Sequence, residues 1–145
     1  MEVFQLKKHE LPLNLLIGTM RTSRYLEQQV KQDVKQYGLN MTEFAVLEFL
    51  YHKGRQPIQQ ISEKILIASS STTYVIDQLG KKGLVNRALC QKDKRVTYAE
   101  LTEKGTTLMA TVFPKHAEKI MELFSVLTES EQETLLEALK KISRY

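Results

Sequence analysis

The hydrophobic pattern of the chain changes its period at one place, and this change restricts the fold more than any other feature. The segments "PIQQISEKIL" and "TTYVIDQLGKKG" repeat apolar residues every three or four positions, and the polar turn "ASSS" joins them. After Gly83 the segments "LVNRALC" and "RVTYAEL" alternate apolar and polar residues and are rich in side chains that favour strands. The sequence therefore predicts two helices joined by a tight turn and followed directly by a β-hairpin.

Two further helices are predicted before this segment. Apolar residues recur at helical spacing up to Tyr37, and Gly38 stands where a C-terminal cap is expected, so the first helix is long. Asn40 followed by Glu43 is typical of a capping box and predicts a second helix that runs toward Gly54.

Two helices are also predicted after the hairpin. Thr102 is placed to cap a long helix, in which Pro114 predicts a kink. Thr128 and Glu131 form a second capping box, at the start of a last amphipathic helix.

These elements together predict a mainly α protein. The fold class is a winged helix-turn-helix with a two-stranded β wing, flanked by N- and C-terminal dimerisation helices. We assign residues 1–38 to an N-terminal dimerisation helix, 39–101 to a DNA-binding domain and 102–145 to C-terminal dimerisation helices. The first and last helices carry apolar stripes too long for the central core alone, which favours a homodimer, with packing inside one chain as the alternative.

Lys and Arg are concentrated in the middle of the chain. Residues 53–95 carry 9 Lys and Arg against 3 Asp and Glu, whereas residues 1–52 carry 6 of each kind and residues 96–145 carry 6 against 8. A basic segment between neutral and mildly acidic flanks suits a face that binds nucleic acid, because phosphate neutralisation supplies most non-specific affinity. Charge alone leaves open the alternative of an ordinary solvated basic surface.

Several classes of protein are disfavoured by what the sequence lacks. A helix needs about 20 apolar residues to span a bilayer, and the longest apolar runs of the sequence are far shorter. The sequence also has no secretory signal pattern, so we expect a cytoplasmic protein with no membrane partner. A single cysteine excludes an intrachain disulfide, and three widely spaced histidines show no zinc-ligand spacing, so we expect no metal and no cofactor. Without a nucleophile–base pair or a phosphate-binding loop, we expect no catalytic residue and no enzyme.

The connection between the two predicted strands reads "CQKDKR" and is the most basic part of the hairpin. Lys92, Lys94 and Arg95 would meet the negative potential of a narrow minor groove. Asp93 cannot bind phosphate and would instead orient a neighbouring arginine. The alternative is an ordinary charged hairpin turn.

The run "ISEKILIASSSTTYVIDQLGKKGLVNRALCQKDKRVTYAELTEKG" resembles the multiple-antibiotic-resistance regulator (MarR) family, as does "GLNMTEFAVLEFL". The resemblance covers nearly the full chain and implies a homodimer that represses genes and releases DNA when a small molecule or an oxidant arrives. It also implies double-stranded DNA as the partner, with Arg95 in the minor groove, oriented by Asp93, and Arg87 near phosphates. The residues that it places at the major groove are Ser69, Ser70, Ser71, Thr73, Tyr74 and Gln78. Two-fold symmetry then predicts a pseudo-palindromic operator.

The resemblance extends to the methylhydroquinone-responsive subgroup of the family, which implies a small aromatic, phenolic or quinone-type effector. Candidate contacts for its ring are the aromatic and thioether side chains of Tyr25, Phe44, Met109 and Phe113. The alternative for all four is ordinary core packing.

A thiol switch is a second possible route of release. The cations Arg87, Lys92 and Arg95 are expected to favour the thiolate of Cys90, which would make it a target for oxidants or quinones. The family's thiol sensors carry their cysteine in the first helix, however, where this chain has none, so an incidental cysteine remains the alternative. A winged-helix adaptor that binds protein in place of DNA is a further alternative, which the salt dependence of duplex binding would separate from a repressor.

Overall fold

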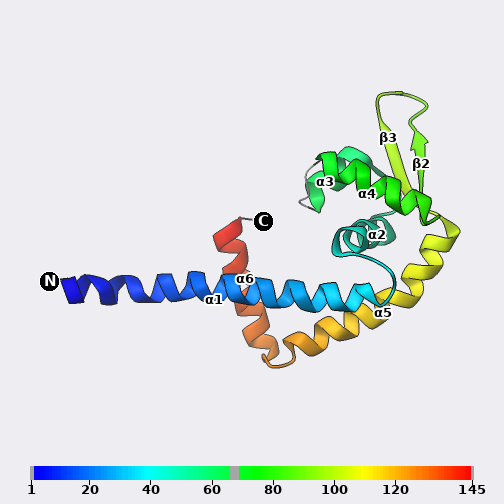
Figure 1. Cartoon of the computed structure of the whole chain (residues 1–145). Coiled ribbons are helices and arrows are strands. Elements are labelled where there is room, and N and C mark those ends of the chain that lie inside the picture. Colours follow the sequence, from blue (N-terminus) through cyan, green and yellow to red (C-terminus); the bar gives the residue numbers. More distant parts are fainter. Residues whose placement is uncertain (1, 66–68, 145) are drawn as a thin grey trace. The chain divides into compact units, whose positions relative to one another are not determined.

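The computed structural model describes residues 2–65 and 69–144, and it describes side chains for residues 9–65 and 71–144. The elements in chain order are α1 (Glu2–Lys35), α2 (Met41–Lys53), β1 (Gln56–Pro57), α3 (Ile58–Lys64), α4 (Ser69–Lys81), β2 (Val85–Leu89), β3 (Thr97–Leu101), α5 (Glu103–Phe124) and α6 (Glu129–Ser143) (Figure 1). The mainly α winged helix-turn-helix predicted from the sequence is confirmed. The chain forms two compact units, Met1–Phe44 and Ala45–Tyr145.

The first unit contains α1 and the start of α2, and its turn is closed by backbone hydrogen bonds. Gly38 has a φ of 76°, and its N–H donates to the carbonyl of Lys35 while the N–H of Leu39 donates to that of Val34. This pair of bonds is a Schellman motif, which needs a left-handed residue after the helix and so favours glycine. The capping box of α2 is confirmed, because Asn40 and Glu43 exchange backbone-to-side-chain hydrogen bonds of 2.8 and 3.1 Å.

The helix α4 ends in the same motif. Gly83 has a φ of 75° and donates to the carbonyl of Gly80, and the N–H of Leu84 donates to the carbonyl of Leu79. Gly80 lies inside the helix, and α4 continues beyond it to Lys81. The backbone hydrogen bonds of the cap hold the last turn in place despite the poor helix propensity of glycine.

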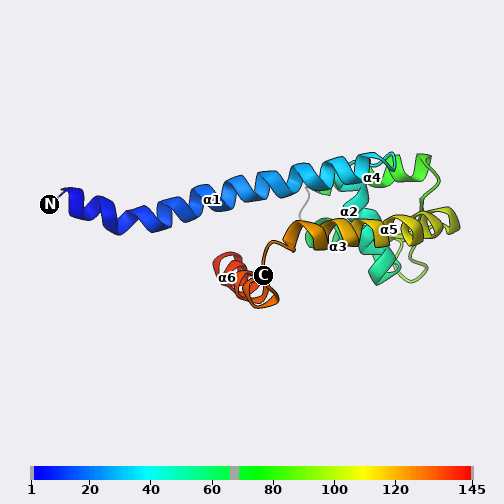
Figure 2. The same cartoon turned by 90° about the horizontal axis from the view of Figure 1, so that it is seen from below.

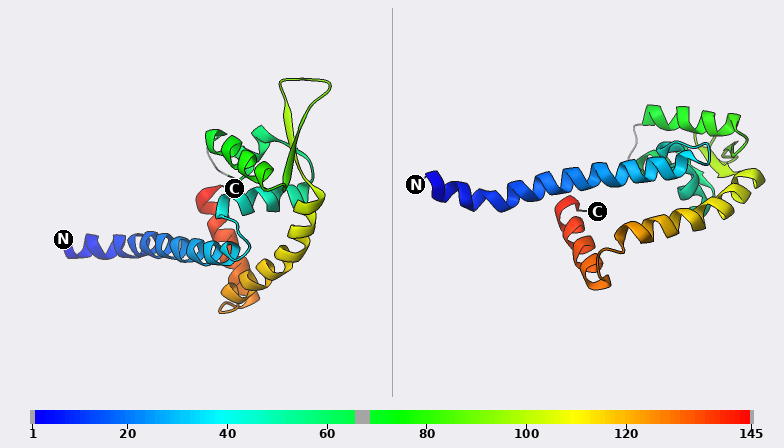
Figure 3. Two further views of the ribbon diagram at one scale, coloured as in Figure 1. Left: turned by 45° about the vertical axis from the view of Figure 1, so that its right-hand side comes forward. Right: turned by 60° about the horizontal axis from the view of Figure 1, so that its bottom comes forward.

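The wing is an antiparallel hairpin of β2 and β3, with Val85 opposite Leu101 and Leu89 opposite Thr97. The sequence did not predict the third strand, β1, which pairs with the outer edge of β3 through Gln56 and Pro57. Figures 1 and 3 show the tip of the hairpin extending beyond α3 and α4. The tip therefore lies clear of these two helices (Figures 1 and 3).

The start of α5 is tied to the end of α4. Thr102 caps α5 by accepting from the N–H of Gly105 at 3.0 Å, and its hydroxyl donates to the carbonyl of Gly83 at 2.6 Å. Its N–H donates to the carbonyl of Leu84 at 3.0 Å. Gly105 is buried, and a Cβ built there would collide with that same carbonyl, so the close approach requires glycine at this position.

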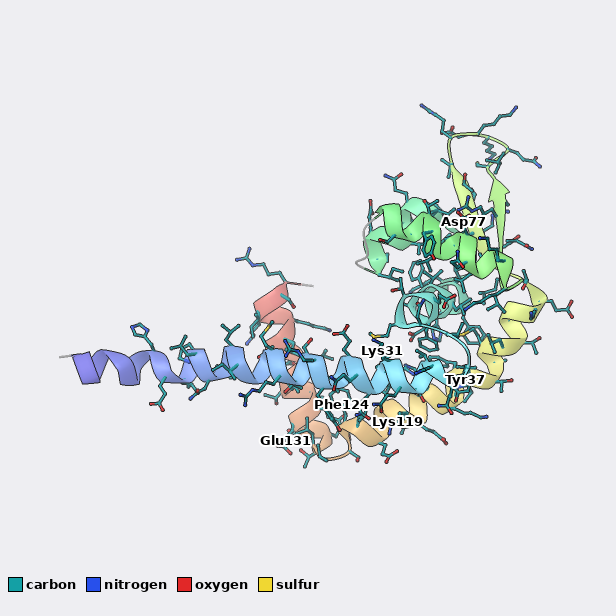
Figure 4. The ribbon with its side chains drawn as sticks, in the orientation of Figure 1. Lys31, Tyr37, Asp77, Lys119, Phe124 and Glu131 are labelled. Atoms are coloured by element: carbon teal, nitrogen blue, oxygen red, sulfur yellow. The ribbon has the colours of Figure 1, made fainter. Side chains whose placement is uncertain are left out.

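The remaining helices of the second unit follow the sequence pattern. α5 is one helix that contains Pro114. Its ribbon is unbroken in Figure 2 and curved in Figure 1. The capping box of α6 is confirmed, since Thr128 and Glu131 exchange hydrogen bonds of 3.0 and 3.2 Å, with Glu131 at the start of the helix (Figure 4).

The core of the second unit lies under α4. The inward face of α4 is buried as its helical period predicts, and it consists of Thr72, Val75, Ile76 and Leu79. Other buried apolar side chains come from α2, α3, the strands and α5: Val46, Leu47, Leu50, Ile61, Leu84, Val85, Ala99, Met109 and Val112. The opposite face of α4 is thereby held outward on a rigid support.

Candidate nucleic-acid interface

The outward face of α4 is polar and exposed. Ser71, Thr73 and Asp77 are exposed, Gln78 is partly exposed, and Tyr74 keeps 64% of its surface in contact with solvent. The backbone of Ser69 and Ser70 forms the first turn of α4, but the predictions made for their side chains lie outside the described side chains. Hydroxyl, amide and phenol groups on an exposed helix are able to bond either phosphates or base edges.

The tip of the wing holds a preformed carboxylate–guanidinium pair. Asp93 accepts from Nε of Arg95 at 3.1 Å through Oδ1 and from Nη2 at 3.3 Å through Oδ2, and its Oδ1 also accepts from the backbone N–H of Arg95 at 3.0 Å. The side chain of Arg95 is nevertheless 91% exposed. These bonds with Arg95, through its side chain and then its backbone N–H, lower the pKa of Asp93. The carboxylate therefore orients an arginine that remains accessible, as the sequence predicted.

The other basic residues of the tip are also accessible. Lys92 and Lys94 are exposed on either side of Asp93. Such side chains add positive charge near the arginine without a fixed geometry, which suits contact with phosphate rather than with a base edge.

Arg87 connects the wing to α4. Its Nη2 lies 2.8 Å from Oδ1 of Asp77 and donates to the carbonyl of Thr73 at 3.3 Å. The sequence did not predict these contacts, although Asp77, the one acidic residue in the sequence of α4, was a signal that could have revealed them. Arg87, Thr73 and Arg95 also line one open cleft of about 650 Å³ among α3, α4 and the strands. One predicted residue of the helix, Thr73, and two of the wing, Arg87 and Arg95, therefore share one surface.

Arg55 is a further cation that the sequence analysis did not single out. Its guanidinium carbon lies 4.5 Å from the centre of the Tyr98 ring, which is a cation–π distance. Tyr98 stands on β3 and faces Pro57 of β1 in the sheet. The contact thus holds the end of an exposed arginine against β3 of the wing.

Cys90 is a partly exposed free thiol at the end of β2. Its pKa is lowered, as predicted, but the expected cause was wrong. The backbone N–H groups of Asp93 and Lys92 lower the pKa by donating to the sulfur, and Tyr98 contributes a weaker hydrogen bond, whereas burial and the Asp93 carboxylate oppose them. Turn geometry, and not the neighbouring cations, favours the thiolate.

The four candidate effector contacts have different environments. Tyr25 is exposed on α1 and Phe44 is buried in α2. Met109 is fully buried, while Phe113 is partly exposed and its ring lies 4.5 Å from the ring of His52. Phe44 and Met109 therefore pack inside the chain, whereas Tyr25 and Phe113 keep accessible surface.

The described residues contain neither a metal-binding cluster nor a membrane-spanning helix. Among them, no group of three or more His, Cys, Asp and Glu side chains has a geometry that could hold a metal ion. No helix within the described ranges combines the length and the apolar character needed to cross a membrane.

Comparison with known proteins gives a consistent result. The model of the MarR family matches residues 39–97. The chain is 49% identical to the HTH-type transcriptional regulator MhqR of Bacillus subtilis (strain 168), over 92% of each protein. Among solved structures, AbsC, a MarR family transcriptional regulator from Streptomyces coelicolor, has a TM-score of 0.86 at 25% identity and covers 91% of both chains. Sco3205 from the same organism, solved in complex with DNA, has the same fold, with a TM-score of 0.85 at 21% identity over 90% of this chain and 84% of its own.

These relatives are transcriptional regulators and not enzymes, which confirms the absence of catalysis expected from the sequence. Identity close to one half along nearly the whole length, together with the winged helix-turn-helix, establishes that the chain belongs to the MarR family of transcriptional regulators.

Proposed function

We propose that the protein is a homodimeric, cytoplasmic repressor that binds a pseudo-palindromic operator in double-stranded DNA and is released by a small aromatic, phenolic or quinone-type effector. The observation that carries the proposal is the Asp93–Arg95 pair. It holds an exposed guanidinium at the tip of the wing, and Arg95 lines the same cleft as Thr73 of α4. Such an arrangement fits a helix in the major groove and an arginine in the adjacent minor groove.

The proposed contacts divide by chemistry. The residues of α4 assigned to the major groove are Ser69, Ser70, Ser71, Thr73, Tyr74 and Gln78. Arg87, Lys92 and Lys94 are assigned to phosphates, and Arg95 to the minor groove with Asp93 as its support. Because α4 presents no arginine that could form a bidentate contact with guanine, sequence preference would rest on hydroxyl and amide contacts and on DNA shape.

Dimerisation is assigned to residues 1–38 and 102–145, and DNA binding to residues 39–101. The support is unpartnered apolar surface on both flanking segments. On α1 the exposed side chains are Leu11, Leu13, Leu15, Leu16, Ile17 and Met20, and on α6 they are Leu135, Leu136 and Ile142. A single chain rarely leaves this much apolar area in water, whereas a two-fold interface would cover it.

The effector is proposed from the identity with MhqR and from the character of four side chains. Tyr25, Phe44, Met109 and Phe113 are the proposed contacts, because aromatic rings and a thioether pack well on a quinone or phenol ring. Phe113 already takes part in an aromatic cluster with Tyr51 and His52, at centroid distances of 6.0 and 4.5 Å.

One observation favours a second route of release, through Cys90. Its lowered pKa increases the thiolate fraction at neutral pH, and the thiolate is the form that adds to quinones and reacts with oxidants. Modification there would disturb the turn whose N–H groups contact the sulfur, next to Asp93.

DNA binding is tested by selecting a duplex from a random pool with the wild-type protein and measuring its affinity by fluorescence anisotropy at several salt concentrations. We expect affinity to fall steeply with salt, and Arg95→Ala to bind about tenfold or more weakly with an unchanged melting temperature. Lys94→Ala is the matched control, since it removes an equal charge from the same turn and should lose less. Equal losses in the two variants would remove the special role of Arg95, and a pool without enrichment would contradict the repressor.

The route of release is tested by adding methylhydroquinone to the complex of that duplex with wild type and with Cys90→Ser. Release from both proteins supports an effector bound through side-chain packing. Release from wild type alone transfers the switch to Cys90, and release from neither contradicts the proposed class of effector.

A further inference from the structure

The contact between Arg87 and α4 raises a question of charge. Asp77 is 52% exposed on the polar face of α4, the face assigned to the DNA backbone and bases (Figure 4). A carboxylate at that place repels phosphate, and the pair that it forms with Arg87 is itself exposed, a setting in which ion pairs contribute little to folding stability. Neither the stability of the fold nor attraction to DNA therefore accounts for the acidic residue.

The geometry around Arg87 accounts for it. Thr73 and Asp77 are one helical turn apart and therefore stand on the same side of α4. Both contact Nη2 of Arg87. This nitrogen donates to the carbonyl oxygen of Thr73 at 3.3 Å and lies 2.8 Å from Oδ1 of Asp77. An arginine has N–H groups on three nitrogens in a rigid plane, so two contacts to one nitrogen fix the plane and leave the groups on Nε and Nη1 for another acceptor.

The orientation has a counterpart at the wing tip. There Asp93 holds Arg95 through Nε and Nη2, and Arg95 and Arg87 line the same cleft together with Thr73. Arg87 lies in the middle of β2, and Arg95 lies in the connection that follows this strand. Each is thus held by an aspartate, one from within the turn and one from α4.

We infer that Asp77 is a positioning residue for DNA binding. It does not touch DNA favourably itself but holds the Arg87 guanidinium between α4 and β2, so that helix and wing present their contacts in one fixed arrangement. The inference rests on the proposed function. Charge alone predicts that removal of a carboxylate from a DNA-binding face strengthens DNA binding. The inference predicts the opposite for Asp77, namely that its removal weakens binding.

The test measures the DNA affinity of protein variants at Asp77, Glu63 and Arg87. Each variant is measured with the duplex selected from a random pool and with a shuffled duplex of equal length. Asp77→Ala should bind the selected duplex about tenfold more weakly, while its affinity for the shuffled duplex stays equal or rises. Asp77→Asn keeps an oxygen that accepts from Arg87 and should retain part of the affinity. Glu63→Gln is the matched control: Glu63 is exposed in the same cleft and has no ion pair among the described residues, so its variant should bind at least as tightly as wild type.

A double-mutant cycle identifies the route of the effect. In an Arg87→Ala background, Asp77→Ala should cause no further loss, because the residue that it positions is already gone. An equal loss in that background, or binding of Asp77→Ala as tight as that of wild type, would overturn the inference. Failure of the proposed function is distinguishable, since the wild-type protein itself would then bind no duplex selectively.

Discussion

Replacement of Gly105 by alanine tests the close contact between α5 and the end of α4. The added Cβ would collide with the backbone carbonyl of Leu84, and it would also come within 3.4 Å of Leu101 Cδ2. The carbonyl belongs to the main chain and already accepts from the N–H of Thr102 at 3.0 Å, so it cannot turn away freely. Either the first turn of α5 shifts or this hydrogen bond lengthens.

The magnitude follows from these contacts. Overpacking a well-filled site costs about 1–3 kcal/mol, and a weakened hydrogen bond adds about 1 kcal/mol. The higher helix propensity of alanine offsets at most about 1 kcal/mol of this. The net expectation for Gly105→Ala is a loss of about 1–3 kcal/mol in the free energy of unfolding, a large share of the stability of a small protein.

Gly80→Ala is the matched control. A Cβ at Gly80 meets only the carbonyl oxygen of Val85, at an ordinary contact distance of 3.8 Å, so alanine fits and should add about 0.5–1 kcal/mol. Urea unfolding followed by circular dichroism, at one fixed protein concentration, measures both changes. If Gly105→Ala proved as stable as wild type, the argument from the close contact would be refuted. The expected contrast between the two glycines would be contradicted if both variants raised, or both lowered, the free energy of unfolding.

Three further predictions concern single groups. Arg95 lowers the pKa of Asp93 in the folded wing, so the pair stabilises the turn at pH values above the ordinary carboxyl pKa. This contribution is lost as the pH falls through the lowered pKa. An NMR titration should give Asp93 a higher pKa in Arg95→Ala than in wild type, and equal pKa values would contradict the pair. Thr128→Ala removes the capping box with Glu131 and should cost about 1 kcal/mol in urea unfolding, with an unchanged midpoint as the contrary result. Alkylation of Cys90 by iodoacetamide should have a pH midpoint below that of free cysteine, and a midpoint at or above it would contradict the backbone contacts to the sulfur.

The fold was predictable where local chemistry determines it. The two capping boxes, at Asn40 and Thr128, each need a fixed spacing between two side chains and were confirmed with both hydrogen bonds. The hairpin and the Asp93–Arg95 pair were likewise legible, because the partners lie two residues apart in a polar turn. Signals of this kind are complete within a few residues of sequence.

The features that were missed depend on residues far apart in the chain. β1 has two residues, one of them Pro57, and no alternation, so only its pairing with β3 reveals it. Arg87 meets Asp77 across 10 positions, and no local pattern announces the contact. The cause of the lowered Cys90 pKa was missed for a related reason, since charge can be counted from sequence, whereas the direction of a backbone N–H in a turn cannot.

The junction around Thr102 has a mechanical consequence. Its hydroxyl and N–H donate to the carbonyls of Gly83 and Leu84, shortly after the end of α4. The ammonium group of Lys104 donates to the carbonyl of Lys82, the first residue after the helix, at 3.0 Å. These hydrogen bonds join the end of α4 rigidly to the start of α5. A rotation of the first turn of α5 would therefore move α4 and the start of β2 with it. Bending is easier in the middle of α5, because Pro114 has no N–H to donate to the preceding turn of the helix.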